Sequence, residues 1–434
     1  MLGWIMICID LIGIDRRKIT TASCNILERL ARWDAQVAQA SDSDDVGTVA
    51  IAKHLYKSYV RVVEPLQDQW GQILKVLAVD AQSATIAPSL WSALVVAQRG
   101  IARLEWTLGK LPGQAVRPAV QDLLLELAPA NSASFPVVLV ADDSEIAEAE
   151  LIGLPITLAQ SPLGWPRMAH GLARFLWPDP GAPDARENTM LDQWDEIALN
   201  WLGPAYAFAL MDCALHQPNT SADKDIWARL SSIRTVLSRD ALWLPEMQEF
   251  FLDLQSVNGW QSGEDLQRVT DDNELSLTRN SPISFDGVGA AGGELITAKE
   301  LAAGNMPKSR AFEFADLAIA EAVAERLQNG ILASSRALLA SHEARRLQDK
   351  LLDDAAPAPE TVYQILEGLR EEPLTSGQIL TGAWLQRERA RRKWLELALQ
   401  AADPVAAYGS QLFFLDALVL KSLETAAVHR VLVR

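Results

Sequence analysis

The sequence predicts a mainly α-helical protein with a small β-sheet, an α+β fold, and two patterns in the chain predict it. Apolar residues recur at helical spacing over most of the chain, as in Ile26, Leu30 and Trp33. Two short apolar runs bounded by turn-forming residues, at 135–140 and 154–158, are typical of strands. A chain of 434 residues, 49% of them hydrophobic, can bury a large core without disulfides.

Changes in these patterns divide the chain into four regions. The helical spacing gives way to the strand-like runs at Asn131, and a polar, glycine-rich stretch later separates two further helical parts. We therefore expect a helical N-terminal region, a core with the sheet and two helices, a helix followed by an irregular segment, and a helical C-terminal region, which are residues 1–130, 131–235, 236–305 and 306–434.

The opening run, Leu2 to Ile14, is apolar and contains Asp10 and Gly13. It is shorter than the roughly 20 residues that a membrane-spanning helix needs, and no basic segment precedes it as in a signal peptide. Because it is rich in β-branched residues, we expect a buried strand or a packed N-terminal segment.

The net charge of the chain limits the kinds of molecule that it can bind, and its cysteine content indicates the cellular compartment. The formal net charge is −17, so the protein's field repels nucleic-acid phosphates and anionic membranes, and we expect neither as a partner. The basic stretch from Arg387 to Lys393 is interrupted by Glu388, and we interpret it as one solvated helix face. Three cysteines without any CxxC pair favour the reducing cytoplasm over a disulfide-rich compartment.

The residues most suggestive of chemistry lie after the second strand-like run. His170 stands in the helical segment GWPRMAHGLARFLW, and Glu196 stands in the next one, QWDEIALNWLGPAYAFAL. This strand–helix–helix order resembles the zincins, HExxH-type zinc metallopeptidases, in the branch whose third zinc ligand is a glutamate. The resemblance covers roughly residues 135 to 235. It implies a zincin-like core flanked by the helical regions, with His170 as first ligand and Glu196 as third.

This sequence departs from the zincin motif at its most diagnostic positions. Gly171 replaces the catalytic glutamate, Arg174 replaces the second histidine, and Asn200 replaces an acidic residue four positions after the third ligand. Glycine cannot accept a proton and a guanidinium is not a metal ligand, so we expect no metal or other cofactor. In its place we predict an Arg174–Glu196 ion pair that joins the two helices. The alternative is plain helical packing around the tryptophans of these segments.

Two other motif matches have simpler interpretations. The segment from Gly287 to Gly292 fits GxGxxG, but no long helix follows it, so we expect a loop rather than a dinucleotide site and leave the role of the Gly287–Gly293 loop open. His342 and Glu343 begin a second HExxH-like match, which ends in Arg346 and lies in a charged helical segment.

The leading functional expectation is a catalytically inactive, metallopeptidase-like protein of the bacterial cytoplasm that acts as a protein-interaction or regulatory scaffold. One alternative is an active metal-dependent hydrolase, a zinc peptidase, that uses His170, Glu196 and a ligand from elsewhere, such as His216 or Asp192. The other is a purely helical structural or interaction protein unrelated to peptidases.

Overall fold

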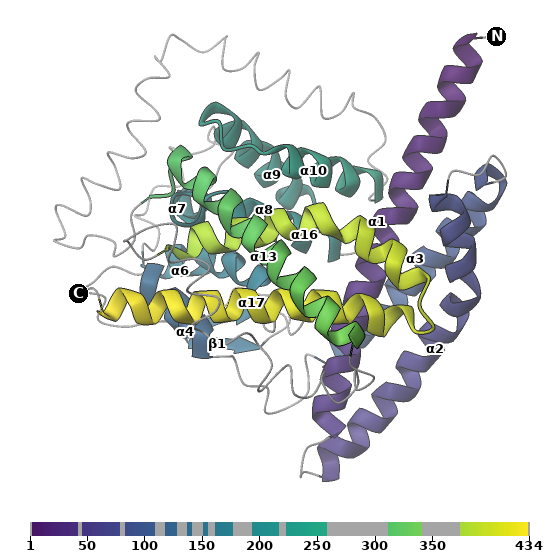
Figure 1. Cartoon of the computed structure of the whole chain (residues 1–434), viewed down its shortest axis with the longest axis horizontal. Helices are drawn as coiled ribbons and strands as arrows, with labels where there is room; N and C mark the ends of the chain where they lie inside the picture. Colours follow the sequence, from purple (N-terminus) through teal and green to yellow (C-terminus); the bar gives the residue numbers. More distant parts are fainter. Residues whose placement is uncertain are drawn as a thin grey trace.

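The structure is a computed structural model of the whole chain (Figure 1), and it describes residues 2–41, 46–78, 83–108, 118–127, 137–140, 151–154, 161–176, 193–216, 223–257, 311–340 and 374–432. Nearly all of these residues lie in helices. The helices and strands are α1 (Leu2–Ser41), α2 (Val46–Leu77), α3 (Ser83–Leu108), α4 (Pro118–Leu127), β1 (Val137–Val140), β2 (Leu151–Leu154), the 3₁₀ helix η2 (Pro162–Arg167), α6 (Met168–Leu176), α7 (Gln193–Leu202), α8 (Pro204–His216), α9 (Asp223–Arg239), α10 (Pro245–Val257), α13 (Phe314–Ala340), α16 (Ser376–Leu399) and α17 (Pro404–Leu432).

Helix α1 is the centre of the molecule. It contacts α2, α3, α10, α16 and α17, and Figure 1 shows it passing between α2 and α3 on one side and the remaining helices on the other. Every residue from Thr21 to Trp33 is buried, so this part of the helix is covered all round. Helix α8 is also buried along nearly its whole length, from Pro204 to Leu215, as expected for a helix that is apolar on every side.

Helix α16 packs on both α13 and α17, and small residues allow its close approach. A Cβ atom added at Gly382 would lie 2.5 Å from the backbone oxygen of Ala320 on α13. At Gly409 of α17, an added Cβ would lie 2.8 Å from Cβ of Ala31 on α1. Thr375 begins α16 with a capping box, in which its hydroxyl accepts from the Gln378 amide and the Gln378 side chain accepts from the Thr375 amide. Glycine therefore sets the spacing of the central helices.

The expected α+β class is wrong, because the described part of the chain is mainly α. Its strands are the four-residue segments β1 and β2, which pair with each other in parallel, with Val137 opposite Leu151 and Val140 opposite Leu154. Two strands of this length are too small a sheet to enclose a core, and most of the buried apolar residues of the described structure lie in helices. The zincin-like α+β core with its sheet is likewise absent from the described structure. Residues 155–158 of the second predicted strand lie outside the described ranges.

The N-terminal run from Leu2 to Ile14 is also not a strand, because it forms the first part of the 40-residue helix α1. The run is followed directly by a segment whose apolar residues have helical spacing, and the helix of that segment extends back through the run despite its β-branched residues. Within the described residues, no helix has both the length and the apolar character needed to cross a bilayer. The four-region division stays a prediction.

We expect Gly382→Ala to lower the free energy of unfolding by about 1 to 3 kcal/mol, because its new methyl group meets a backbone atom that cannot move away alone. Gly71→Ala is the matched control, since Gly71 is exposed in α2 and an added Cβ has no neighbour within 4 Å. That change should stabilise the helix by up to about 1 kcal/mol. Chemical denaturation of both variants measures the difference, and equal effects would contradict the close approach of α13 and α16.

Candidate functional site

His170 and its neighbours form a contact between α6 and α7. His170 is 6% exposed, and its ring meets Trp194 of α7 edge-on with the ring centroids 6.0 Å apart. Its Nε2 lies 3.9 Å from Oδ1 of Asp195, beyond hydrogen-bonding distance. Ile197 and Trp201 of α7 are buried, as the packing interpretation predicts. An aromatic ring and the carboxylate of Asp195 are thus among the neighbours of His170.

The predicted ion pair between Arg174 and Glu196 is wrong. The Arg174 guanidinium lies over the Trp194 ring, 5.5 Å from its centroid, and within the described residues no ion pair joins Arg174 to Glu196. Consecutive side chains of a helix project about 100° apart, so Trp194 and Glu196 point to nearly opposite sides of α7. Burial raises the pKa of the Glu196 carboxyl, and the charge of Arg239 on α9 opposes that shift.

The remaining predicted residues do not complete a metal site. Gly171 is buried in α6, and Asn200 is exposed at the end of α7, where its carbonyl accepts from the Phe312 amide at 2.6 Å. Among the described residues, no group of three or more His, Cys, Asp or Glu side chains could hold a metal ion. The side chains of Asp192 and His216 lie outside what the structure describes, as do the Gly287–Gly293 segment, His342, Glu343 and Arg346.

Asp195 is the polar centre of this region, and the sequence analysis missed it. It is fully buried, and Arg229 of α9 binds it with two hydrogen bonds, Nε to Oδ2 at 2.9 Å and an Nη to Oδ1 at 2.7 Å. The Tyr206 hydroxyl of α8 donates to Oδ1 and accepts from Arg229 at 3.0 Å. In the sequence, Asp195 stands next to a second carboxylate, Glu196, and nothing in this local pattern showed which of the two is buried. The network joins α7, α8 and α9.

A second polar group lies in the middle of the protein and links α1 to three other helices. One Nη of Arg387 on α16 binds both Glu28 of α1 at 2.6 Å and Asp212 of α8 at 2.9 Å. Arg32 of α1 binds Asp416 of α17 at 2.8 Å and Glu28 at 3.2 Å. All five side chains are at most 9% exposed. Pairs this deeply buried are sensitive to the loss of either member.

The same group continues along α16. Arg391 binds Asp253 of α10, and its Nε lies 2.9 Å from Glu388. Asp253 also pairs with Arg17 of α1 at 2.9 Å. Burial raises the pKa of Glu388, while Arg391 and Arg387 oppose that shift. We name the whole set the central charge cluster, which consists of Arg17, Glu28, Arg32, Asp212, Asp253, Arg387, Glu388, Arg391 and Asp416.

The interpretation of the basic stretch as one solvated helix face is therefore wrong. Arg387 and Arg391 point into the core, whereas Arg389 and Arg392 are 40% and 52% exposed. Residues four apart share one side of a helix, and on α16 that side meets carboxylates from α1, α8 and α10. Since those carboxylates are far away in the sequence, the pattern of the stretch alone could not reveal them.

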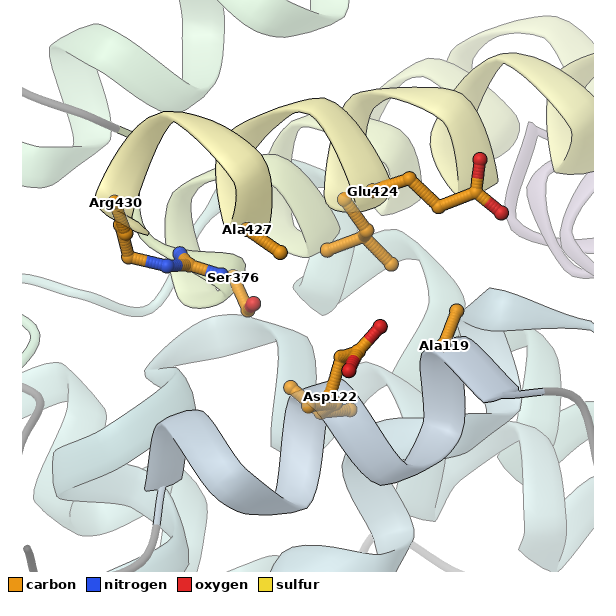
Figure 2. Close-up of a pocket in the computed structure, with 8 residues that line it drawn as sticks. Ala119, Asp122, Ser376, Glu424, Ala427 and Arg430 are labelled. Atoms are coloured by element: carbon orange, nitrogen blue, oxygen red, sulfur yellow. The ribbon is translucent and has the colours of Figure 1, made fainter. Parts of the chain in front are cut away.

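A small pocket lies between α4 and α17, and Figure 2 shows the side chains that line it. Asp122 projects from α4 toward α17, and Arg430 and Ser376 close one end. Glu126 of α4 already satisfies these two groups, because its carboxylate accepts from the Ser376 amide at 3.0 Å and from Arg430 at 2.8 Å. This polar contact joins α4, α16 and α17.

The depth of the central charge cluster gives a measurable prediction. We expect Arg387→Met to cost about 3 to 5 kcal/mol of unfolding free energy, because Glu28 and Asp212 lose a buried cationic partner. Arg389→Met, two residues further on, removes the exposed pairs with Glu246 and Glu321 and should cost less than about 1 kcal/mol. Urea denaturation of both variants measures these losses. Equal losses would mean that burial does not distinguish the two arginines.

Glu196 gives a pH-dependent prediction. Its folded-state pKa is raised above the ordinary 4.5, so the wild type gains stability from this group below pH 4.5 and loses that gain as the pH rises through the folded-state pKa. Glu196→Gln removes the ionisation, so the stability of the variant relative to the wild type should increase from pH 4 to pH 7. Melting temperatures across this range test the sign. A relative loss at neutral pH would show that the carboxylate form of Glu196 is the one the fold prefers.

Comparison with known proteins does not extend this description. No protein-family model, curated protein or solved structure matches the chain. The resemblance of residues 135–235 to zincins stays a prediction that rests on His170 and Glu196. The functional proposal below is accordingly argued from the geometry of the described residues.

Proposed function

We propose that this protein is a non-catalytic helical scaffold of the cytoplasm that acts by binding a protein partner. The observation that carries the proposal is the engagement of the candidate catalytic region in structural contacts. His170 packs against Trp194, and Arg174 lies over the same ring. Asp195, the most deeply buried carboxylate there, is bound by Arg229 and Tyr206.

Charge and burial support this assignment over hydrolysis. A general base must reach the proton that it removes, and Asp195 is fully buried with three hydrogen bonds from protein donors. His170 contacts Trp194, and Trp194 and Glu196 project from nearly opposite sides of α7, so the two expected ligands do not converge on one point. The net charge of −17 favours a protein partner over nucleic acid.

Metal analysis tests the proposal against the zinc-hydrolase alternative. We expect the purified full-length protein to hold far less than one zinc per chain, and His170→Ala to leave unchanged both this content and the shift of the melting temperature that added zinc causes. His429→Ala, on α17, is the control for nonspecific binding of zinc to a histidine. Near-stoichiometric zinc that is lost in the His170 variant alone, together with hydrolysis of a casein substrate, would overturn the proposal.

A further inference from the structure

Helix α2 carries a row of basic side chains on its outer surface. Lys53, Lys57 and Arg61 are exposed and follow one another at intervals of four residues. With a rise of about 1.5 Å per residue, the three Cα atoms span about 12 Å along one side of the helix. Figure 1 places α2 at the edge of the molecule, where α1 and α3 flank it.

An apolar row runs beside the cations. Tyr56 is 50% exposed, and Val60 and Val63, the next residues at steps of four and three, are partly buried against the core. The spacing is that of a helix face that meets another helix. Tyr56 stacks on Tyr59 at 6.0 Å, and Tyr59 stacks on the buried Trp33 of α1 at 5.4 Å. These rings hold the outer surface of α2 firmly on the central helix.

The cations of this row differ from the arginines of α16. Arg387 and Arg391 lie among buried carboxylates, and even the exposed Arg389 binds Glu246 and Glu321. Within the described residues, neither Lys53 nor Lys57 takes part in an ion pair. Both lysine side chains are exposed to solvent, so carboxylates from another molecule can reach them. We name Lys53, Tyr56, Lys57, Val60, Arg61 and Val63 the α2 face.

We infer that the α2 face docks an acidic amphipathic helix of the partner protein, an inference that rests on the proposed scaffold function. Carboxylates at four-residue intervals on such a helix would meet Lys53, Lys57 and Arg61 in register. Apolar residues between them would cover Tyr56 and the two valines. Lys53, Lys57 and Arg61 give two turns of α2 a local positive charge that suits one short acidic helix. A longer polyanion would extend past these cations over the rest of a chain with net charge −17.

Binding of a defined peptide tests the inference. The probe is a fluorescein-labelled synthetic helix of three heptads with leucine on one side and flanking glutamates, and its counterpart has lysine in place of glutamate. We expect the full-length protein to bind the acidic helix only, with affinity that falls as salt rises. Lys53→Glu with Lys57→Glu should weaken binding at least about tenfold, and Tyr56→Ala should weaken it at every salt concentration.

The matched control is Arg326→Glu with Lys393→Glu, which makes the same change in net charge at exposed positions of α13 and α16. This variant should bind within about twofold of wild type, because interactions beyond a Debye length are screened. Equal weakening in both double variants, or no binding of the acidic helix, would overturn the inference. The inference would also be overturned if the protein bound a poly-thymidine oligonucleotide or phosphatidylserine vesicles more tightly than the acidic helix, and if the Lys53→Glu, Lys57→Glu variant lost that binding. Zinc content tests the scaffold function, and peptide binding tests the α2 face. Near-stoichiometric zinc would therefore overturn the scaffold function whatever the peptide result, whereas loss of peptide binding alone would overturn only the docking inference.

Discussion

The position of Glu28 on the buried central helix constrains the rest of the structure. Its carboxylate lies between Arg32 on its own helix and Arg387 on α16, and Arg387 in turn binds Asp212 of α8. A charge in the interior is costly unless it is paired and hydrogen-bonded. Each of these helices must therefore have one position along its axis and one rotation about it, so that its charged side chain reaches its partner. A shift of one residue along α1 would turn the carboxylate about 100° away from its partners.

Apolar burial and ion pairing have different roles in this fold. Helix α8 and parts of α1 and α16, residues 21–33 and 376–387, are buried on all sides, and burial of their apolar side chains is the main favourable term in folding. Apolar burial is also non-directional, because its free energy depends on the area removed from water and hardly on which apolar side chains meet. The central charge cluster and the Asp195 network are directional, since Arg387 and Arg229 each need carboxylates at hydrogen-bonding distance. We interpret the ion pairs as the contacts that select one arrangement of the helices.

The region around His170 is a second place where polar side chains connect helices, and it lies where α6, α7, α8 and α9 meet. Trp194 contacts both His170 and Arg174 of α6, while the adjacent Asp195 binds α8 and α9. One turn of α7 thus holds three neighbouring helices. Histidine, arginine and carboxylate side chains are the types that suggest a catalytic site in a sequence. In this region side chains of these types make the contacts between helices.

The sequence by itself determined the helical character of most of the chain and the apolar sides of the helices, because both follow from periodicity within a single segment. It also placed His170 and Glu196 on successive helices, α6 and α7. It predicted a strand within residues 135–140, where β1 lies, but it did not determine the conformation of the apolar run at Leu2–Ile14, since a short apolar run suits a strand or a buried helix equally. Only the tertiary structure decided which charges are buried. Arg387 and Arg389 look alike in the chain, but their partners lie on α1 and α8 for one and on α10 and α13 for the other. Burial depends on how distant segments meet, and local spacing contains no information about that.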